Sequence, residues 1–164
     1  MTLARRGPGR SVLFVCHGNI CRSPYAEAVL RRLLRERRAD AVHVDSMGLI
    51  NPGRPSPGEA ISGAARRGVD ISHHRSRVLT GEAVHAATLV IVMDDMQRRL
   101  LLQRFGKHRD ELLVLGDLDP FPIESRAIKD PYDGAEAVFD ASYGRIDRCV
   151  HCLVEALFQD AKSL

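Results

Sequence analysis

Two cysteines flank a short turn near the start of the chain, and an arginine and a serine follow the second one. The segment CHGNICRSP runs from Cys16 to Pro24, with five residues between Cys16 and Arg22. A turn of this kind between a strand and a helix can point successive backbone N–H groups inward at the helix N-terminus, which makes a concave site for a tetrahedral oxyanion. The segment therefore predicts a phosphate-binding loop.

The residues inside this loop suit that purpose. Gly18 supplies conformational freedom, and Asn19 accepts a left-handed backbone conformation while its side chain can tie the loop down. The planar guanidinium of Arg22 can contact two phosphate oxygens at once. We expect Gly18 and Asn19 to shape the cradle and Arg22 to complete it.

The same surroundings act on Cys16. N–H donors at a helix N-terminus and a neighbouring arginine favour the thiolate, which is the nucleophilic form of cysteine, and the hydroxyl of Ser23 could donate a further hydrogen bond to it. Attack on phosphorus would give a cysteinyl-phosphate and divide ester hydrolysis into two steps. The leaving oxygen then needs a proton. Asp130, in the segment DPYDG, is a candidate acid, although spacing alone does not place it beside Cys16.

These groups depend on an alternation of strands and helices. Short apolar or alternating runs predict strands at 11–15, 41–46, 88–93 and 111–116. Apolar residues at helical spacing predict helices at 24–38, 59–67, 95–105 and 135–159. We expect a single-domain α/β three-layer sandwich, in which a four-stranded parallel sheet carries helices on both faces. The phosphate-binding loop follows strand 1, at the carboxyl edge where such folds bind ligands.

Length and composition fit one globular domain. The chain has 164 residues, of which 45% are apolar and 27% are charged. We expect residues 1–10 to form a flexible N-terminal segment and residues 11–164 to form the domain. The net charge of +3 is too small to indicate a nucleic-acid-binding protein, and no aromatic residue interrupts the arginines of 31–38. We expect those arginines to form a solvated helix face.

No apolar run approaches the roughly 20 residues of a membrane span, and the run at 12–15 is too short for the core of a signal peptide. We therefore expect a cytoplasmic monomer without membrane insertion or a structural disulfide. The segment CVHC at 149–152 has zinc-like spacing but lies within an apolar-periodic helix. Its cysteines are expected to be core or surface thiols, and no metal site is expected.

The chain resembles the low-molecular-weight protein tyrosine phosphatases. The segments VLFVCHGNICRSPYAEAVL, DSMG, HRSR, VMD, LGD and DPYDG occur in the order and at the spacings of that family, and the likeness runs from Val12 to about Leu157. The resemblance implies that Cys16 is the nucleophile, Arg22 the phosphate binder and transition-state clamp, and Asp130 the general acid. It implies no metal or organic cofactor.

The resemblance also assigns supporting residues. Four positions match residues that buttress the loop through hydrogen bonds: Asn19, Ser23, Ser46 and His74. Cys21 matches a vicinal cysteine that forms a reversible disulfide with Cys16 and shields it from irreversible oxidation. A core cysteine that acts as a small buried hydrophobe is an equal alternative for Cys21.

Substrate choice is expected to depend on the pocket walls. Ile20 favours phosphotyrosine, since related arginine phosphatases carry Thr there. Leu49, Ile50 and Asn51 stand where many relatives place Trp or Tyr, so one wall would be aliphatic. This pattern is more similar to the bacterial branch associated with exopolysaccharide synthesis and its tyrosine kinases, and it implies a tyrosine-phosphorylated protein as partner. The expected substrate-binding residues are His17, Gly18, Asn19, Ile20, Cys21, Ser23, Ile50 and Tyr132.

Alternative functions on the same fold remain open. Arsenate reductases use a similar Cys-Arg loop, but they need further cysteines in a segment near 80–90, and this chain has none there. An arginine phosphatase is a second alternative. A non-catalytic phosphate-binding protein is a third, although such proteins usually lack the nucleophile, the arginine or the acid, and this sequence keeps all three candidates.

Overall fold

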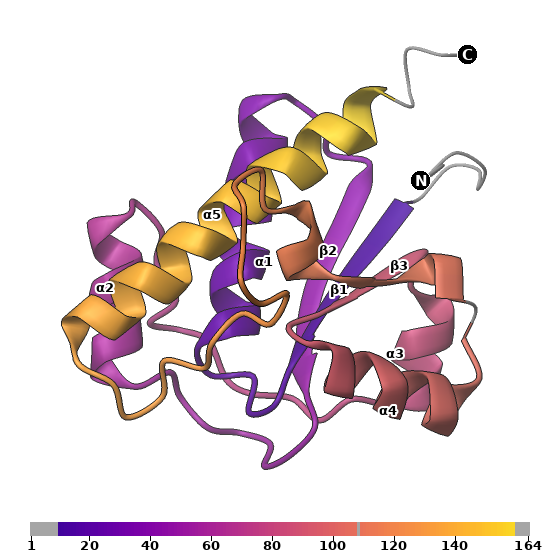
Figure 1. Cartoon of the computed structure of the whole chain (residues 1–164), viewed down its shortest axis with the longest axis horizontal. Coiled ribbons are helices and arrows are strands. Elements are labelled where there is room, and N and C mark those ends of the chain that lie inside the picture. Colours follow the sequence, from indigo (N-terminus) through magenta and orange to yellow (C-terminus); the bar gives the residue numbers. More distant parts are fainter. Residues whose placement is uncertain (1–9, 108, 160–164) are drawn as a thin grey trace.

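A parallel sheet organises the chain in the computed structural model, which describes residues 10–107 and 109–159 (Figure 1). Its strands are β1 (Arg10–Cys16), β2 (Val42–Gly48), β3 (Leu89–Val92) and β4 (Leu112–Val114), in the order β2-β1-β3-β4. Each neighbouring pair is parallel. The predicted four-stranded parallel sheet is therefore confirmed.

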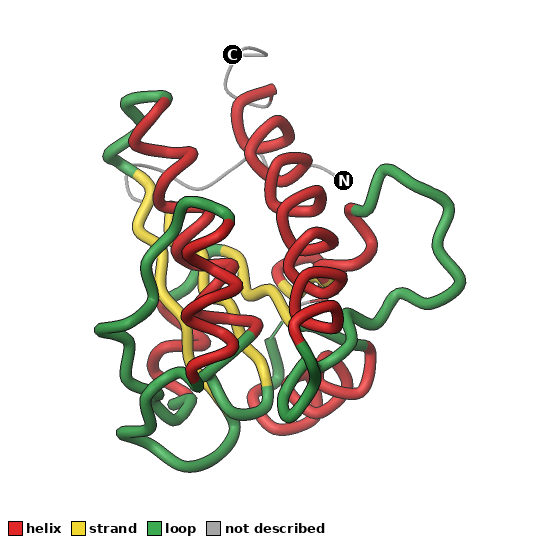
Figure 2. The backbone as a smooth tube through the Cα atoms, turned by 90° about the vertical axis from the view of Figure 1, so that its left-hand side faces the viewer, coloured by secondary structure: helices red, strands yellow, loops and turns green. Residues whose placement is uncertain are grey.

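Helices cover both faces of this sheet (Figures 1 and 2). On one face lie α1 (Arg22–Glu36) and α5 (Glu136–Gln159), with α2 (Gly58–Arg66) packed against α5, and on the other lie α3 (Gly81–Ala86) and α4 (Asp95–Phe105). Side chains alternate along a strand, so Phe14 faces the first layer and Leu13 and Val15 face the second. This arrangement is the expected three-layer sandwich.

The ends of the elements differ from the predictions in places. Residues 1–9 of the expected flexible segment lie outside the described residues, whereas Arg10, also expected there, is the first residue of β1 and pairs with Val42. Helix α1 begins at Arg22, two residues before the predicted start, so Pro24 lies in its first turn, where a proline is tolerated. It ends at Glu36 rather than 38, because Arg38 has a left-handed backbone with φ 54°.

Three short elements were not predicted. Helix α3 begins after Thr80, whose hydroxyl accepts a hydrogen bond from the N–H of Ala83 at 3.2 Å, but the helix is too short to show apolar periodicity. Two 3-10 turns, η1 (Arg109–Glu111) and η2 (Leu115–Leu118), bracket β4. The fourth strand is therefore shorter than the predicted 111–116.

The topology places a crevice at the end of β1. The chain leaves β1 toward β2 on one side and later returns to β3 on the other side. In such sheets, ligands bind outside the carboxyl ends of the strands at the point where the strand order reverses. Cys16 is the last residue of β1 and pairs in register with Gly48, the last residue of β2.

A buried aromatic pair holds the helices beneath this edge. The rings of Tyr25 and Tyr143 stack with centroids 3.8 Å apart and an interplanar angle of 4°. The hydroxyl of Tyr25 donates to Asp147 at 2.6 Å, and Arg67 donates to the same carboxylate at 2.7 Å. The hydroxyl of Tyr143 donates to the carbonyl of Cys21 at 3.1 Å, which ties α5 to the residue before α1.

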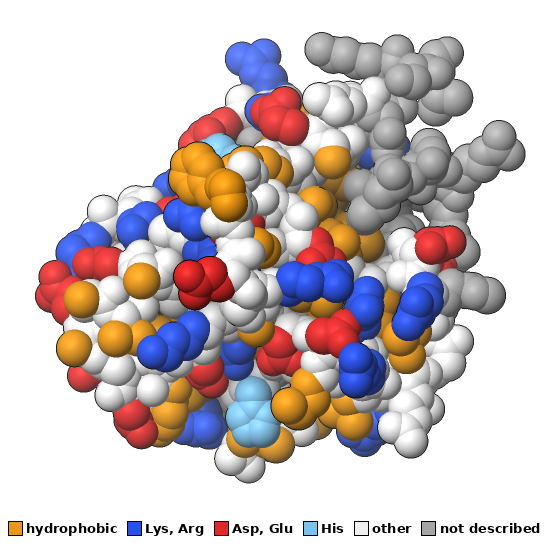
Figure 3. Space-filling view, in the orientation of Figure 1, with side chains coloured by type: hydrophobic (Ala, Val, Ile, Leu, Met, Phe, Trp, Pro, Cys, Tyr) orange, Lys and Arg blue, Asp and Glu red, His pale blue; other side chains and the backbone are white. Residues whose placement is uncertain are grey.

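Basic and acidic side chains are mixed over the face of the molecule that Figure 3 shows. On α1, Arg31 pairs with Glu27 at 2.8 Å, and Arg37 at the helix end pairs with Glu155. The arginines of this helix therefore belong to a solvated and partly ion-paired face, as predicted. In the described part of the chain, none of the helices is long and apolar enough to cross a membrane.

Candidate active site

The segment between β1 and α1 curls around the sulfur of Cys16. The N–H of Asn19 donates to Sγ of Cys16 at 3.2 Å, and Oγ of Ser23 lies 3.0 Å from the same sulfur. The Ser23 oxygen accepts a hydrogen bond from the Asn19 amide at 2.8 Å, which leaves the hydroxyl proton free to point at the sulfur. Both donors are placed to stabilise negative charge that sits at the start of α1.

The left-handed residue of the loop is Asn19, with φ 53°. This agrees with the prediction, because Asn tolerates this conformation better than most residues. Gly18 does not have a positive φ, and a Cβ there would make ordinary contact with Ile20 at 3.5 Å. The left-handed turn of the loop is therefore made by Asn19 and not by Gly18, which forms part of the pocket wall.

The buried side chain of Asn19 joins the loop to three other segments. Its amide nitrogen donates to Ser23 at 2.8 Å and to Ser46 on β2 at 2.9 Å. Its side-chain oxygen accepts from the N–H of Arg77 at 2.9 Å. Nε2 of His74 lies 2.7 Å from the Asn19 carbonyl, so this nitrogen donates. The four residues that the resemblance assigned as buttresses thus lie in one hydrogen-bonded network.

Two further supporting residues were not identified from the sequence. The hydroxyl of Ser46 donates to Glu27 at 2.5 Å, which connects the network to α1. A Cβ on Gly48 would lie 2.8 Å from Cβ of Asn19 and 2.9 Å from its backbone nitrogen. Only glycine therefore lets β2 end directly against the loop. The segment DSMG contains this glycine, but the close approach becomes evident only from the strand register.

Arg22 is buried at the base of the site, with 4% of its surface exposed. Its Nη1 donates to the carbonyl of Ile128 at 3.1 Å, and its Nη2 donates to the Asp130 carboxylate at 3.1 Å. Its Nε has no hydrogen-bond partner among the described residues. A buried donor without a partner is costly, so Nε fits an oxyanion held over the loop. A two-pronged contact would use Nε and Nη2 together.

Asp130 reaches this site from the long loop that precedes α5. Ile128 anchors the loop: its side chain is 1% exposed, and its N–H donates to the carbonyl of Met93 at 2.9 Å. The Asp130 carboxylate is 45% exposed and also accepts from the N–H of Tyr132 at 3.2 Å. The structure therefore brings this acid and Cys16 to one pocket, which spacing alone did not do.

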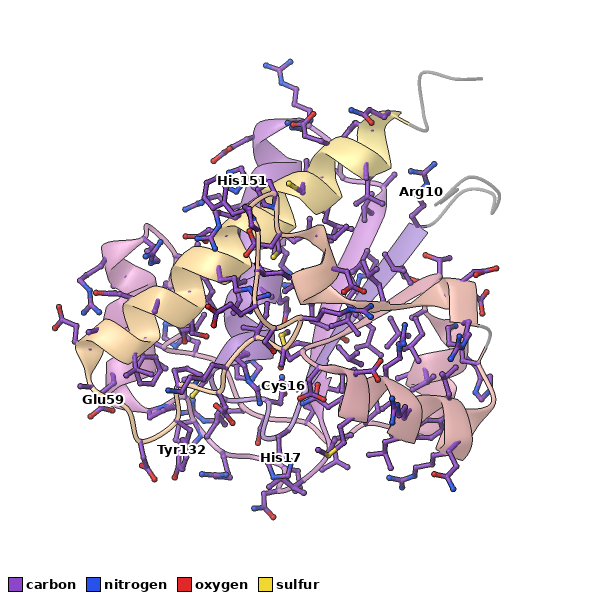
Figure 4. The ribbon with its side chains drawn as sticks, in the orientation of Figure 1. Arg10, Cys16, His17, Glu59, Tyr132 and His151 are labelled. Atoms are coloured by element: carbon purple, nitrogen blue, oxygen red, sulfur yellow. The ribbon has the colours of Figure 1, made fainter. Side chains whose placement is uncertain are left out.

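The pocket has a volume of about 260 Å³. Figure 4 shows Cys16 at the end of β1, with His17 and Tyr132 nearby at the edge of the molecule. The lining residues are Cys16, His17, Gly18, Ile20, Cys21, Arg22, Ile50, Arg54, Asp130 and Tyr132. Asn19 and Ser23, expected to bind substrate, do not line it, because both are fully buried beneath the loop in their mutual hydrogen bond.

Comparison with known proteins identifies the family. A family model described as low molecular weight phosphotyrosine protein phosphatase matches residues 11–163. The chain belongs to this family. The phosphatase is 36% identical over 146 residues to a probable low molecular weight protein-tyrosine-phosphatase, EpsP, of Ralstonia solanacearum, which covers 88% of this chain and 94% of the relative.

Solved structures agree with this assignment. The phosphatase superposes on a low molecular weight protein tyrosine phosphatase from T. tengcongensis with a TM-score of 0.81 and 28% identity, over 90% of this chain and 99% of the other. It also superposes on the arginine phosphatase YwlE from Geobacillus stearothermophilus with a TM-score of 0.81 and 27% identity, over 94% and 96%. The predicted family and fold are confirmed, and the arginine phosphatase is a same-fold alternative without better support.

Arg54 is a pocket residue of the phosphatase that sequence reasoning missed. It lies in the loop after β2, and its guanidinium carbon is 5.9 Å from the centroid of the Tyr132 ring. The one sequence feature that could have indicated it is that Arg54 is a single cation within the Pro/Gly-rich stretch NPGRPSPG. Loops at the carboxyl ends of parallel strands reach ligands, so this cation could have been proposed for the pocket.

The second cysteine of the pocket differs chemically from a nucleophile. Burial raises the pKa of the Cys21 thiol to about 12, and the negative charges of Asp130 and Cys16 add to this rise. Cys21 is therefore protonated at neutral pH, and a thiol is a poor nucleophile. Cys149 of the CVHC segment is also buried. Among the described residues, no group of three His, Cys, Asp or Glu side chains could hold a metal ion.

Replacing Gly48 should distort the loop. In Gly48→Ala the new methyl group would overlap Asn19, so we expect a loss of stability of about 1–3 kcal/mol together with reduced hydrolysis of an aryl phosphate. Gly58→Ala is the matched control, because nothing lies within 4 Å of a Cβ at Gly58. Urea unfolding and steady-state kinetics measure the two effects. Equal activity in the two variants would show that the Gly48–Asn19 contact does not control the site.

Proposed function

We propose that this phosphatase hydrolyses phosphotyrosine in proteins, through a cysteinyl-phosphate formed on Cys16. The observation that carries the proposal is the shared pocket of the Cys16 sulfur, the Arg22 guanidinium and the Asp130 carboxylate. The unpaired Nε of Arg22 supports it further, because a phosphate oxygen would supply the acceptor that this buried donor lacks.

The first step transfers the phosphoryl group to sulfur. A phosphate held by Nε and Nη2 of Arg22 takes the place of the Asp130 carboxylate at Nη2. The Cys16 thiolate then forms a bond to phosphorus while the bond from phosphorus to the tyrosine oxygen breaks. Protonated Asp130 gives its proton to that oxygen, so tyrosine leaves as the neutral phenol.

The second step releases phosphate. Asp130, now ionised, accepts a proton from a water molecule, and the water oxygen bonds to phosphorus while the bond from phosphorus to sulfur breaks. The Cys16 thiolate is restored, with the hydroxyl of Ser23 placed to stabilise it. Inorganic phosphate leaves, and Asp130 again carries the proton. No metal or organic cofactor enters either step.

The depth of the pocket favours phosphotyrosine. Cys16 is 2% exposed at its base, whereas Tyr132 is 48% exposed at its mouth. A long side chain can carry phosphate to the sulfur, and the side chain of phosphoserine is shorter. Ile50 and Tyr132 offer apolar and aromatic surface to a ring. Ile20 supports phosphotyrosine over phosphoarginine, because related arginine phosphatases carry Thr at that position.

We further propose that the partner is a tyrosine-phosphorylated cytoplasmic protein, including a tyrosine kinase of exopolysaccharide synthesis. Two observations support this proposal. Ile50 lines the pocket where the resemblance to that bacterial branch expects an aliphatic residue, and the chain is 36% identical to the Ralstonia protein EpsP.

A peptide panel tests the proposed function. We expect the wild-type protein to hydrolyse a phosphotyrosine peptide with a higher kcat/KM than matched phosphoserine and phosphoarginine peptides, measured as released phosphate. The Cys16→Ser variant, which keeps the size of the side chain, should be inactive on all three peptides. Preferred turnover of the phosphoarginine peptide would contradict the proposal.

Removal of the acid should depend on the leaving group. Asp130→Asn is expected to lower kcat by about 10²- to 10⁴-fold for alkyl or phenyl esters with poor leaving groups. The loss should be much smaller for a nitrophenyl ester, because its phenolate leaves without a proton. Steady-state kinetics on the two substrates measure the contrast. An equal loss on both would count against the acid role of Asp130.

We propose a protective role for Cys21 in oxidation. Peroxide converts the Cys16 thiolate to a sulfenic acid, and the Cys21 thiol can then form a disulfide with that sulfur as water leaves. We expect dithiothreitol to restore the activity of peroxide-treated wild-type protein and to restore less activity in Cys21→Ser. Cys149→Ser, which removes a buried thiol outside the pocket, is the control. Equal recovery in all three proteins would leave Cys21 a core residue only.

A further inference from the structure

Arg54 occupies a different level of the pocket from Arg22. The guanidinium of Arg54 lies over the ring of Tyr132, which is 48% exposed, whereas Arg22 is 4% exposed beside the sulfur. Arg54 itself is partly exposed. The pocket therefore has one arginine at its base and another at its mouth.

The positive charge of Arg54 is not neutralised by a neighbour. Within residues 10–107 and 109–159, Arg54 forms no ion pair with a carboxylate, and its guanidinium contact is the face of Tyr132. Asp130, the carboxylate that lines the same pocket, is paired with Arg22 at 3.1 Å. The charge of Arg54 also reaches inward: burial raises the pKa of Cys21, and Arg54 and Arg22 oppose this rise.

Hydrogen bonds on both sides fix the backbone of Arg54. Its N–H donates to the hydroxyl oxygen of Ser76 at 2.9 Å, and its carbonyl accepts from the N–H of Ser76 at 2.8 Å. The same hydroxyl donates to the carbonyl of Asn51 at 2.7 Å, and Ser76 is 2% exposed. The backbone that carries the side chain is thus fixed at the mouth before a ligand arrives, and the guanidinium contacts the Tyr132 ring, which lowers the entropic cost of using the cation in binding.

We propose that Arg54 binds the carboxylate of an aspartate or glutamate next to the phosphotyrosine, so that the phosphatase prefers acidic sites. This inference rests on the proposed function. Arg22 and the loop N–H groups serve the phosphate, and Ile50 and Tyr132 flank the ring, so the substrate backbone leaves the pocket beside Arg54. A planar guanidinium matches a carboxylate with two parallel hydrogen bonds.

A pair of peptides tests this inference. They are identical except that the residues flanking phosphotyrosine are Glu in one and Gln in the other. For the wild-type protein we expect kcat/KM to be about three- to fivefold higher with the Glu peptide, in the range of a partly exposed ion pair. The ratio should shrink as salt rises.

The variants separate a local contact from net charge. Arg54→Gln should bring the Glu-to-Gln ratio close to one, and Arg54→Lys should keep part of it. Arg35→Gln is the control for net charge: it removes an exposed arginine charge from α1, about 20 Å further along the helix from Arg22. This control should keep the wild-type ratio.

Each other outcome overturns the inference. An unchanged Glu-to-Gln ratio of kcat/KM in Arg54→Gln would show that Arg54 does not recognise the residues flanking phosphotyrosine. An equal loss on the Glu peptide, the Gln peptide and a small aryl phosphate would assign Arg54 to the phosphate or to loop shape. An equal effect of Arg35→Gln would show a net-charge effect. Failure of the proposed function is distinguishable, because the wild-type protein would then hydrolyse neither phosphotyrosine peptide, or would hydrolyse a phosphoarginine peptide faster than both.

Discussion

The rest of the site depends on the hydrogen bonds of the buried residue Asn19. A left-handed backbone at a residue other than glycine is unfavourable. Here four hydrogen bonds hold it: Asn19 donates to Ser23 and Ser46 and accepts from Arg77 and His74. Those partners belong to separate segments of the chain. The shape of the cradle is therefore a property of the assembled domain, and any change that moves β2 or the segment around His74 should reach the sulfur.

The positive charge of Arg22 at the base of the pocket is stabilised by the protein itself when no ligand is bound. A buried guanidinium needs partners, and Arg22 obtains them from the Ile128 carbonyl and the Asp130 carboxylate. Both come from the one long loop that Ile128 anchors in the core. The loop thus satisfies the arginine when phosphate is absent and carries the acid that the reaction needs when phosphate is present.

Features that depend on residues close together in the sequence could be predicted, whereas features that depend on contacts between distant segments could not. Helix α4 was predicted at its observed bounds, and the features that fix those bounds are local: Asp94 caps its start and Gly106 ends it. The Cys16–Arg22 loop was predicted because its spacing is also local. Gly48 and Ile128 were missed because their roles are contacts between segments far apart in the chain. Asp130 could be joined to Cys16 only through resemblance to a family, and the folded structure supplies the shared pocket.

The central claim is that Cys16 carries the phosphoryl group during turnover. The direct test mixes the wild-type protein with an excess of aryl phosphate, quenches the mixture in acid within milliseconds, and maps the modified peptide by mass spectrometry. The account predicts one phosphoryl group on Cys16, formed before steady-state release of inorganic phosphate, and none on Cys21. A phosphoryl group on another residue, or turnover without any phosphorylated protein, would contradict it.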